Sequence, residues 1–374
     1  MRILFVLDKR VDAGSIHAVA NYVQAGDEAG YLVALYGAPD ARYPTIRFSR
    51  DPASFDRVIF ITETGLQLSS LQVGRLLAEV PCAARVIVDT DGMYNPLTIL
   101  DDYDRNHRSE RERQDWLARH ALGDTVLQPT LERPGPGTLA VPFFGYDPAL
   151  RAEPRPTAPA CDIVYVGHNW WRWREMRTSI LPAVESLRDR LGEICLIGSW
   201  WDAPPEWAAY LALERAFEVD AVWLRQLRIR TRPAVRYSDV VRTMSEGRVN
   251  IMLQRPLLRH LRLLTAKYFE LFCAETIPLV GLDPDHAASI YGPEGRALAL
   301  YPDVADRVAD AIGHQARYRD IVEAVRQHLA AHHSYRKRLQ ELIAVLQSAP
   351  GASSPRRAAP VAATVAEGRG HTCD

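Results

Sequence analysis

Residues 249–282 read VNIMLQRPLLRHLRLLTAKYFELFCAETIPLVGL, and this stretch decides the predicted fold. Residues 249–253 and 277–282 are short apolar runs rich in β-branched side chains, which is typical of strands buried on both faces of a parallel sheet. The segment between them predicts a helix that Thr265 caps, because its apolar residues are spaced three and four positions apart. Strand, basic loop, helix and strand make one βαβ unit, so the sequence predicts an α/β protein with parallel sheets.

The loop of this unit is rich in positive charge. In an open parallel sheet, ligands bind beyond the carboxyl ends of the strands. The basic residues expected there are Arg255, Arg259, His260, Arg262 and Lys267. Such a cluster favours an anionic ligand, above all a diphosphate, because cationic side chains form charge-assisted hydrogen bonds with phosphate oxygens. Glu270 shares a helix face with Lys267, and its carboxylate can accept hydrogen bonds from the two hydroxyls of a ribose.

The composition is that of an ordinary globular chain. With 374 residues, the protein exceeds what one hydrophobic core usually supports, so two domains are expected. The net charge of −1 at pH 7 argues against nucleic acid or an anionic membrane as a partner. The longest apolar runs have the length of strands, so neither a transmembrane segment nor a signal peptide is expected. The oligomeric state stays open.

The five cysteines lie far apart in the sequence, at Cys82, Cys161, Cys195, Cys273 and Cys373. An odd, scattered set argues against a disulfide framework and predicts a reducing, cytoplasmic location. The sequence has no C-x-x-C pair, no H-x-x-H pair and no clustered Cys/His set, so we expect no metal and no cofactor.

Three prolines in residues 151–160 mark the clearest boundary, because proline fits neither a helix interior nor a central strand. We therefore predict a first Rossmann-like domain at 1–150, a linker at 151–160 and a second Rossmann-like domain at 161–330. A helix is predicted at 331–347. Residues 348–374 are rich in Ala, Pro, Gly and Arg without an apolar period, which predicts a disordered tail.

Three motifs of the second half resemble those of a known family. The run KYFELFCAETIPLV at residues 267–280 is similar to the R-x-F-E-A-x-A-C-G-x-P-L-V signature in the donor domain of GT-B nucleotide-sugar glycosyltransferases. Gly167 with Arg172 and Arg174 resembles a G-x-x-x-x-R-R loop, and HSYRKR at 333–338 resembles a terminal H-[ST]-[YW]-x-x-R helix. The resemblance is closest to the glycosyltransferase-like spore-maturation (CgeB-type) family.

This resemblance implies a GT-B fold, in which two Rossmann-like parallel-sheet domains face a central cleft. The first domain would bind the acceptor, the second would bind the nucleotide-sugar donor, and the last helix would cross back to the first domain. Glu270 would hold the nucleotide ribose, and the segment with Tyr237 and Ser238 would read the base. Arg262 stands where retaining families have the first of two glutamates, which argues against a retaining mechanism of that type.

Several residues of the second half have more than one interpretation. Gly167, His168, Arg172 and Arg174 follow a predicted strand and suit a phosphate. The tryptophans at 170, 171 and 173 cannot all face one core, so they form a buried wedge, an interdomain contact or a stacking surface for a base or sugar. Lysine occurs only at positions 9, 267 and 337, which favours a phosphate ligand at Lys267 over a snorkelling surface lysine. Ser238 also suits a helix cap.

Candidate residues of the first half follow its predicted strands. Gly14 allows close approach to a ligand and Ser15 suits a helix cap, although a plain turn has the same residues. His17 faces either the cleft or the next helix. Glu63, Asp89 and Asp91 end strands where a general base would lie, and Asx-turn chemistry is the alternative for the two aspartates. The charged segment 101–113 suits a solvated helix face or a flexible loop on the acceptor side.

We therefore predict a metal-independent glycosyltransferase that moves a sugar from a nucleoside diphosphate to an acceptor hydroxyl of a small molecule, glycan or natural product. Cations including Arg255, Arg262 and Lys267 would stabilise the departing diphosphate. One of the acid or imidazole side chains of the first half would activate the acceptor if the reaction inverts. The alternatives are a nucleotide-sugar epimerase on the same fold and a catalytically inactive GT-B-like binding protein.

Overall fold

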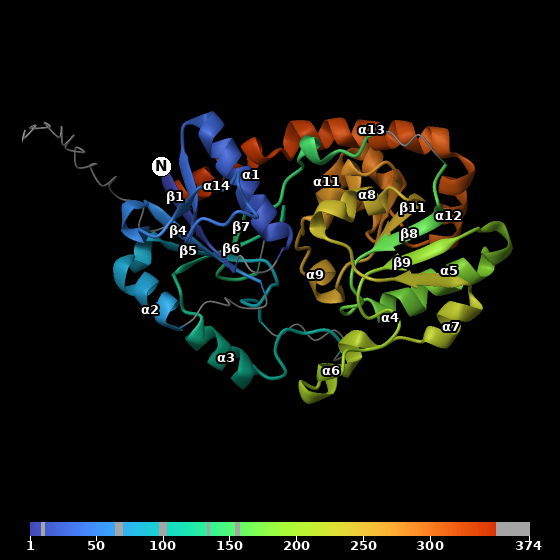
Figure 1. Ribbon diagram of the computed structural model, residues 1–374, viewed down its shortest axis with the longest axis horizontal. Coiled ribbons are helices and arrows are strands. Elements are labelled where there is room, and N and C mark those ends of the chain that lie inside the picture. Colours follow the sequence, from blue (N-terminus) through green and yellow to red (C-terminus); the bar gives the residue numbers. More distant parts are fainter. Residues whose placement is uncertain (9–11, 64–69, 97–102, 133–134, 154–157, 349–374) are drawn as a thin grey trace, which may run out of the picture.

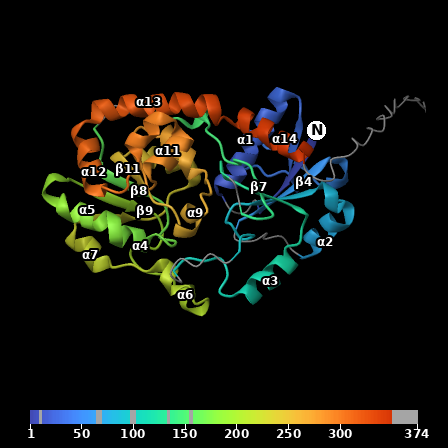
Figure 2. The same cartoon turned by 180° about the vertical axis from the view of Figure 1, so that it is seen from behind.

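Two parallel sheets form the framework of the protein, which a computed structural model describes for residues 1–8, 12–63, 70–96, 103–132, 135–153 and 158–348 (Figures 1 and 2). The sheet of the first half has the order β3 (Phe48–Ser49), β2 (Leu32–Tyr36), β1 (Arg2–Val6), β4 (Arg57–Thr62), β5 (Arg85–Asp89), β6 (Thr125–Gln128) and β7 (Leu139–Ala140). The sheet of the second half has the order β10 (Ile229–Arg232), β9 (Ile194–Ile197), β8 (Cys161–Val166), β11 (Gly247–Met252) and β12 (Ile277–Val280). Neighbouring strands within each sheet run parallel, as the sequence predicts.

Each sheet reverses its direction of growth at its first strand. β1 lies between β2 and β4, and β8 lies between β9 and β11. Phe5 of β1 is in register with both Leu35 and Ile59, its partners on either side. Such a reversal leaves a crevice outside the carboxyl ends of the two diverging strands, which is where ligands bind in open α/β sheets.

The helices of the first half are α1 (Gly14–Ala29), α2 (Ser70–Glu79) and α3 (Glu110–Arg119). Side chains of β1 alternate between two buried clusters: Ile3 and Phe5 belong to the cluster that contains α1, and Leu4 to the cluster that contains α2. Both faces of the sheet are therefore covered. α1 ends at Gly30, whose φ of 75° lets the chain turn in the left-handed conformation and enter β2.

The helices of the second half are short, except for the last three. They are α4 (Trp173–Glu175), α5 (Leu181–Ser186), α6 (Trp207–Tyr210), α7 (Ala221–Gln226), α8 (Val240–Met244), α9 (Pro256–His260), α10 (Lys267–Glu270), α11 (Pro284–Tyr291), α12 (Val304–Gly313), α13 (Gln315–His332) and α14 (Tyr335–Ser348). The residue before α10 is Ala266, and Thr265 accepts the N–H of Tyr268 through its backbone carbonyl, so the predicted Thr265 side-chain cap is wrong.

The last helix packs against the first one. α13 lies along the second half, and α14 contacts α1 (Figures 1 and 2). The ring of Tyr335 in α14 meets the ring of Tyr22 in α1 edge-on, with centroids 5.6 Å apart. Arg57 of β4 donates to the carbonyl of Leu346 at 3.1 Å. The last described helix, α14, therefore packs against the first half of the protein.

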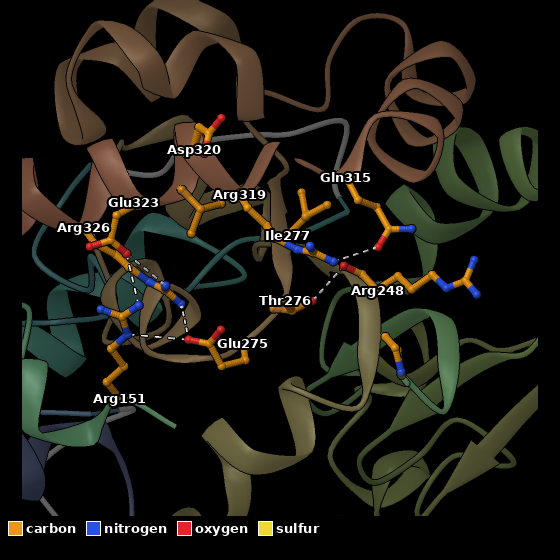
Figure 3. A pocket seen from close by; sticks show the side chains of 12 residues that line it. Arg151, Arg248, Glu275, Thr276, Ile277, Gln315, Arg319, Asp320, Glu323 and Arg326 are labelled. Atoms are coloured by element: carbon orange, nitrogen blue, oxygen red, sulfur yellow. Dashed lines mark hydrogen bonds and ion pairs between the residues drawn. The ribbon is translucent and has the colours of Figure 1, made fainter. Parts of the chain in front are cut away.

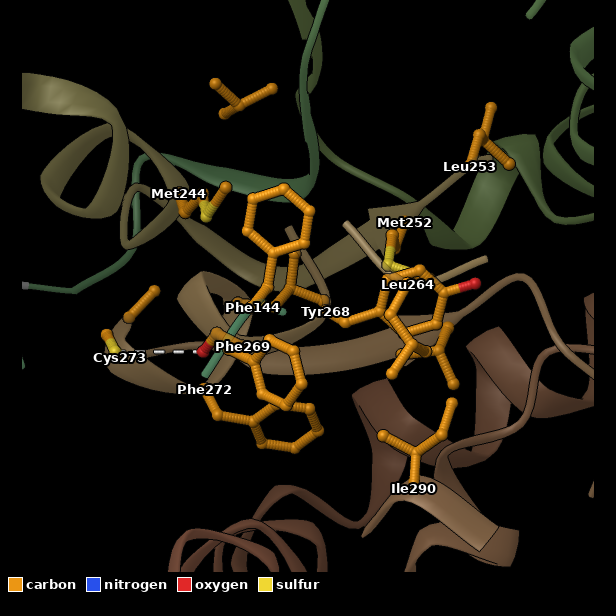
Figure 4. Close-up of a cluster of buried hydrophobic side chains, with 14 of the residues drawn as sticks. Phe144, Met244, Met252, Leu253, Leu264, Tyr268, Phe269, Phe272, Cys273 and Ile290 are labelled. Atoms are coloured by element: carbon orange, nitrogen blue, oxygen red, sulfur yellow. Dashed lines mark hydrogen bonds between the residues drawn. The ribbon is translucent and has the colours of Figure 1, made fainter. Parts of the chain in front are cut away.

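One buried apolar cluster runs through both halves. Phe144, which follows β7, belongs to this cluster together with Phe269 and Phe272 near α10 (Figure 4). Phe269 and Phe272 are almost completely buried. The two halves therefore share apolar packing behind α10, which holds that helix in place. In the described ranges, every helix is too short or too polar to cross a lipid bilayer.

Candidate functional site

Polar side chains of both halves meet beyond the carboxyl ends of the central strands. In the first half, β1 leads toward α1, and β4 and β5 lead to Glu63 and Asp91. In the second half, β8 leads to Gly167, and the connection from β11 to β12 carries Lys267 on α10. Both crevices produced by the strand orders thus contribute residues to one region.

Lys267, Arg172 and His168 form a group of basic side chains in the second half. Lys267 Nζ lies 3.6 Å from Glu270 Oε2. Burial lowers the pKa of Lys267, while Glu270 opposes this effect and Arg172 adds to it. Burial, Lys267 and Arg172 also lower the pKa of His168. Each basic group thus disfavours the charge of its neighbours, so an anion bound among them would be stabilised.

Arg172 has an unused donor. Its Nη1 donates to the carbonyl of Trp170 at 2.6 Å, whereas its buried Nε has no hydrogen-bond partner among the described residues. Leaving a buried guanidinium N–H unpaired is costly, and a phosphate oxygen is a suitable acceptor. Beside it, His168 Nδ1 accepts the backbone N–H of Ser199 at 3.1 Å. Gly167 accepts the indole N–H of Trp201 at 2.9 Å through its carbonyl.

Glu270 connects these cations to the first half. Its carboxylate is 7% exposed, and Oε1 accepts the hydroxyl of Tyr237 at 2.5 Å. The ring of Tyr237 stacks on the ring of His17 from α1, with centroids 3.8 Å apart. His17 Nε2 in turn lies 2.8 Å from Asp12 Oδ1. Tyr237 is therefore the residue of its segment that reaches Glu270, whereas the neighbouring Ser238 is exposed in the same 3₁₀ turn.

Two glycines let the halves approach each other closely around this group. A Cβ placed on Gly14 would lie 2.5 Å from Ala266 Cβ and 3.8 Å from Glu270 Oε1. A Cβ placed on Gly92, which has a φ of 71°, would lie 2.5 Å from Leu261 Cδ1. The start of α1 and the turn after β5 therefore contact the segment that leads into α10, where no further side chain would fit.

Asp89 is held inside the first half by three donors. Its oxygens accept the backbone N–H groups of Met93 at 2.8 Å and Tyr94 at 3.0 Å, and the side chain of Gln128 at 3.0 Å. Burial still raises the pKa of Asp89 to about 6, because it outweighs these hydrogen bonds. This arrangement corresponds to the turn-forming alternative for the Asp89 side chain, since the carboxylate closes the loop after β5.

Glu63 and Asp91 lie beside the close contacts between the halves. Glu63 accepts a hydrogen bond from Ser15 Oγ, next to Gly14, and Asp91 precedes Gly92. Burial raises the pKa of Glu63, the hydrogen bond from Ser15 opposes this effect, and the negative charge of Asp91 adds to it. These two carboxylates are thus electrostatic neighbours on the side of the first half that meets the segment before α10.

Arg255 forms an ion pair and a hydrogen bond with residues of the first half. Its Nε lies 2.8 Å from Oδ1 of the completely buried Asp104, and its Nη2 donates to Asn106 at 3.0 Å. Asp104 also accepts the N–H of Leu257 at 2.9 Å. The prediction of a solvated helix face for segment 101–113 is therefore wrong at Asp104; residues 101–102 lie outside the described residues, and α3 begins only at Glu110. Sequence spacing did not single out Asp104, because it lies in a dense run of both charges.

Two further predicted arginines also contact the first half. Arg262 has a φ of 52° and forms an ion pair with Glu132. The backbone N–H of Arg174 donates to the hydroxyl of Tyr103 at 3.1 Å, and the guanidinium of Arg174 lies 5.2 Å from the centre of that ring.

The tryptophans of this segment have different surroundings. The ring of Trp171 meets the ring of Tyr103 edge-on, with centroids 5.1 Å apart. Of the alternatives considered for the tryptophans, Trp171 thus forms an interdomain contact, while Trp173 is buried in the main core.

A hollow lies at the opposite edge of the second sheet, at the amino ends of β11 and β12 (Figure 3). It is lined by Arg151, Pro159, Arg248, Glu275, Thr276, Ile277, Gln315, Arg319, Asp320, Val322, Glu323 and Arg326. Arg151 and Arg326 each pair with Glu275 and Glu323. This hollow is remote from the strand ends that carry the predicted site.

The arrangement of two Rossmann-like parallel sheets, joined at their carboxyl-end loops and by a final helix on α1, defines the class: the fold is GT-B, as the motifs predict. Within it, residues 174–344 match the family described as "Glycosyl transferase-like". No curated protein matches the chain.

Solved structures with the same fold cover nearly the whole chain. T4 phage BGT in complex with UDP and Mn2+ is 12% identical with a TM-score of 0.54, and the match covers 92% of this chain and 99% of that chain. T4 phage BGT in complex with its UDP-glucose substrate is 12% identical with a TM-score of 0.55, and the match again covers 92% of this chain and 99% of that chain. An alpha-glucosyltransferase in complex with UDP and a 13-mer DNA is 13% identical with a TM-score of 0.59, and the match covers 93% of this chain and 100% of that chain.

Proposed function

We propose that this protein is a glycosyltransferase that moves a sugar from a nucleoside diphosphate to an acceptor hydroxyl, and that it is a relative of the CgeB-type family. The main support is the grouping of Arg172 and His168 with Lys267, which pairs with Glu270 where the second half meets Gly14. A diphosphate would satisfy these basic groups and the unpartnered Nε of Arg172. Glu270 would accept hydrogen bonds from the ribose hydroxyls.

The basic group would act on the leaving diphosphate. Negative charge grows on the diphosphate as the glycosidic bond breaks, and fixed cations stabilise it most when water is excluded. Because burial and, to a smaller extent, the charge of Arg172 lower the pKa of Lys267, a bound diphosphate would favour its charged form. We propose that these side chains make a metal ion unnecessary. Activity that survives chelation would agree with this part of the proposal. Activity that is lost on chelation while the protein stays folded, in wild type and in the Cys161→Ala variant alike, would contradict it.

The acceptor would be activated by a carboxylate of the first half. Glu63 and Asp91 both border the contacts with the second half, whereas Asp89 is used within its own loop. A base there would deprotonate an acceptor that attacks from the side opposite to the diphosphate, so the anomeric configuration would invert. Arg262, at the position of a glutamate in the retaining signature, agrees with inversion.

Uridine diphosphate is the first donor nucleotide to test, because the structures with this fold contain UDP or UDP-glucose. Isothermal calorimetry with UDP, GDP, dTDP and ADP should identify one nucleotide that binds. Lys267→Met should weaken the binding of that diphosphate by roughly tenfold or more and leave the nucleoside unaffected, because a charge-assisted hydrogen bond is worth about 1.5–3 kcal/mol. The matched control is Lys337→Met, on the exposed side of α14.

Two outcomes would overturn the proposal. Absence of affinity for all four diphosphates would favour a catalytically inactive GT-B-like protein. Conversion of the nucleotide sugar into an isomer without any acceptor would favour an epimerase. Transfer to water or to an added hydroxyl compound, with release of the diphosphate, is the expected result.

A further inference from the structure

Two cysteines that are far apart in sequence meet near the amino-terminal ends of two neighbouring strands of the second sheet. Cys161 is the first residue of β8, and Cys195 lies in β9. Their sulfur atoms are 2.9 Å apart, and the two residues are 2% and 0% exposed. A carboxylate oxygen of Glu193 lies 3.6 Å from Cys195 Sγ. One ligand atom from each of the three residues lies within 4.8 Å of the others.

Arg230 lies beside these three residues. Its Nη2 lies 2.5 Å from Glu193 Oε1 and 3.5 Å from Cys195 Sγ. The guanidinium therefore offsets part of the negative charge that the three groups carry as metal ligands.

We propose that Cys161, Cys195 and Glu193 bind a soft divalent cation such as Zn2+, with a water molecule as the fourth ligand. Two thiolates and a carboxylate form a ligand set that zinc accepts in tetrahedral geometry. Such geometry places the two sulfurs about 3.8 Å apart at zinc–sulfur bonds of about 2.3 Å, so the sulfurs must separate by small side-chain rotations. Arg230 then balances the remaining negative charge through Glu193, as outer partners of metal ligands commonly do.

The site would lie away from the proposed transferase site. β8 carries Gly167 and His168 at its carboxyl end, whereas Cys161 begins this strand at the other end. A bound ion would tie the start of the second half to β9, directly after the segment that connects the two halves. The inference is independent of the proposed transferase activity. Metal binding is expected to raise the thermal stability of the protein and to leave nucleotide binding unchanged.

Cobalt is a suitable probe, because a thiolate–Co2+ complex has a charge-transfer absorption band. The background for the test is the full chain with Cys82→Ser and Cys373→Ser, which removes the exposed cysteine and the one in the C-terminal tail. Reduced protein should bind one equivalent of Co2+ with this band and release thiol protons as it does so. Zn2+ should displace the cobalt. Cys161→Ala and Cys195→Ala should each abolish the band, and Glu193→Gln should weaken binding about tenfold or more.

Three results would overturn the proposal. The first is a band of full intensity in the folded Cys161→Ala protein, with folding checked by circular dichroism. The second is reduced background protein that shows no band and no rise in melting temperature with Co2+ or Zn2+. The third is untreated background protein whose intact mass is lower by two hydrogen atoms than that of the reduced protein, which would show that the pair exists as a disulfide.

Discussion

His17 and Tyr237 come from different halves of the chain, and their rings stack with centroids 3.8 Å apart and planes inclined by 8°. The hydroxyl of Tyr237 also donates to Glu270, which pairs with Lys267. A substitution at His17 in the first half can therefore affect the proposed ribose-binding carboxylate of Glu270, because one ring contact and one hydrogen bond connect the two residues.

The first prediction concerns this stack. In a double-mutant cycle, His17→Ala and Tyr237→Ala should show a coupling energy of about 0.5–1.5 kcal/mol, the usual value for a ring pair beyond its buried area. The measurement is denaturant unfolding of the wild-type protein, the two single variants and the double variant. Additive effects would show that the two halves gain nothing from this contact.

Glu270→Gln should weaken binding of the donor nucleotide by roughly 10–100-fold, because hydrogen bonds to a charged group contribute about 1.5–3 kcal/mol. Calorimetry with the nucleoside and its diphosphate measures the effect, and both ligands should lose affinity because both carry the ribose. The control is Glu185→Gln, an exposed glutamate in α5. Unchanged dissociation constants in the folded Glu270 variant would remove the ribose role.

Glu63→Gln and Asp91→Asn should separate base catalysis from donor binding. Loss of a general base lowers kcat by about 10²–10⁴-fold. We expect this loss for one of the two variants, with the affinity for the donor nucleotide unchanged. Burial raises the pKa of Glu63 above 4.5, so if Glu63 is the base, kcat should fall as the pH drops through that raised pKa. Near wild-type kcat in both variants would reject both assignments.

The ion pair between Arg255 and Asp104 should stabilise the contact between the halves. Both side chains are buried, so Arg255→Ala leaves a buried carboxylate without its partner and should cost about 3–5 kcal/mol in the free energy of unfolding. The control is Arg242→Ala in the pair with Asp239, whose guanidinium side chain is 81% exposed, and its expected cost is below about 1 kcal/mol. Equal costs for the two variants would contradict a buried, stabilising pair.

Asp89 should make stability depend on pH. Its pKa is about 6 in the folded protein and 3.8 as the ordinary value, so the folded state binds the proton more tightly. Its contribution to stability is therefore present at low pH and is lost as the pH rises from 3.8 to about 6. Relative to Asp89→Asn, the wild-type protein should gain on the order of 1 kcal/mol between pH 7 and pH 5. Parallel pH profiles of the two proteins would argue against the raised pKa.

Local patterns were sufficient to predict the parallel sheets and the pairing of Lys267 with Glu270 in the second half. The apolar runs at 249–253 and 277–282 form β11 and β12, because a segment of β-branched residues flanked by turn residues has few other ways to bury itself. Lys267 and Glu270 are one helical turn apart, so their pairing follows from the sequence. The predicted Thr265 side-chain cap is wrong, because the N–H of Tyr268 is bonded to the backbone carbonyl of Thr265.

Contacts between residues far apart in the sequence were decided only by the tertiary structure. Asp104 and Arg255 are 151 residues apart, and Cys161 and Cys195 are 34 apart. Neither pair has a spacing that marks it, because the first depends on how the two halves dock and the second on the pairing of β8 with β9. By itself, the sequence determined two parallel sheets and a basic, carboxylate-containing helix start at one of them. The tertiary structure decided that Arg172 lies near Lys267, whereas Arg255 and Arg262 form ion pairs that join the two halves. A buried charge pairs with whichever opposite charge the packing brings within reach.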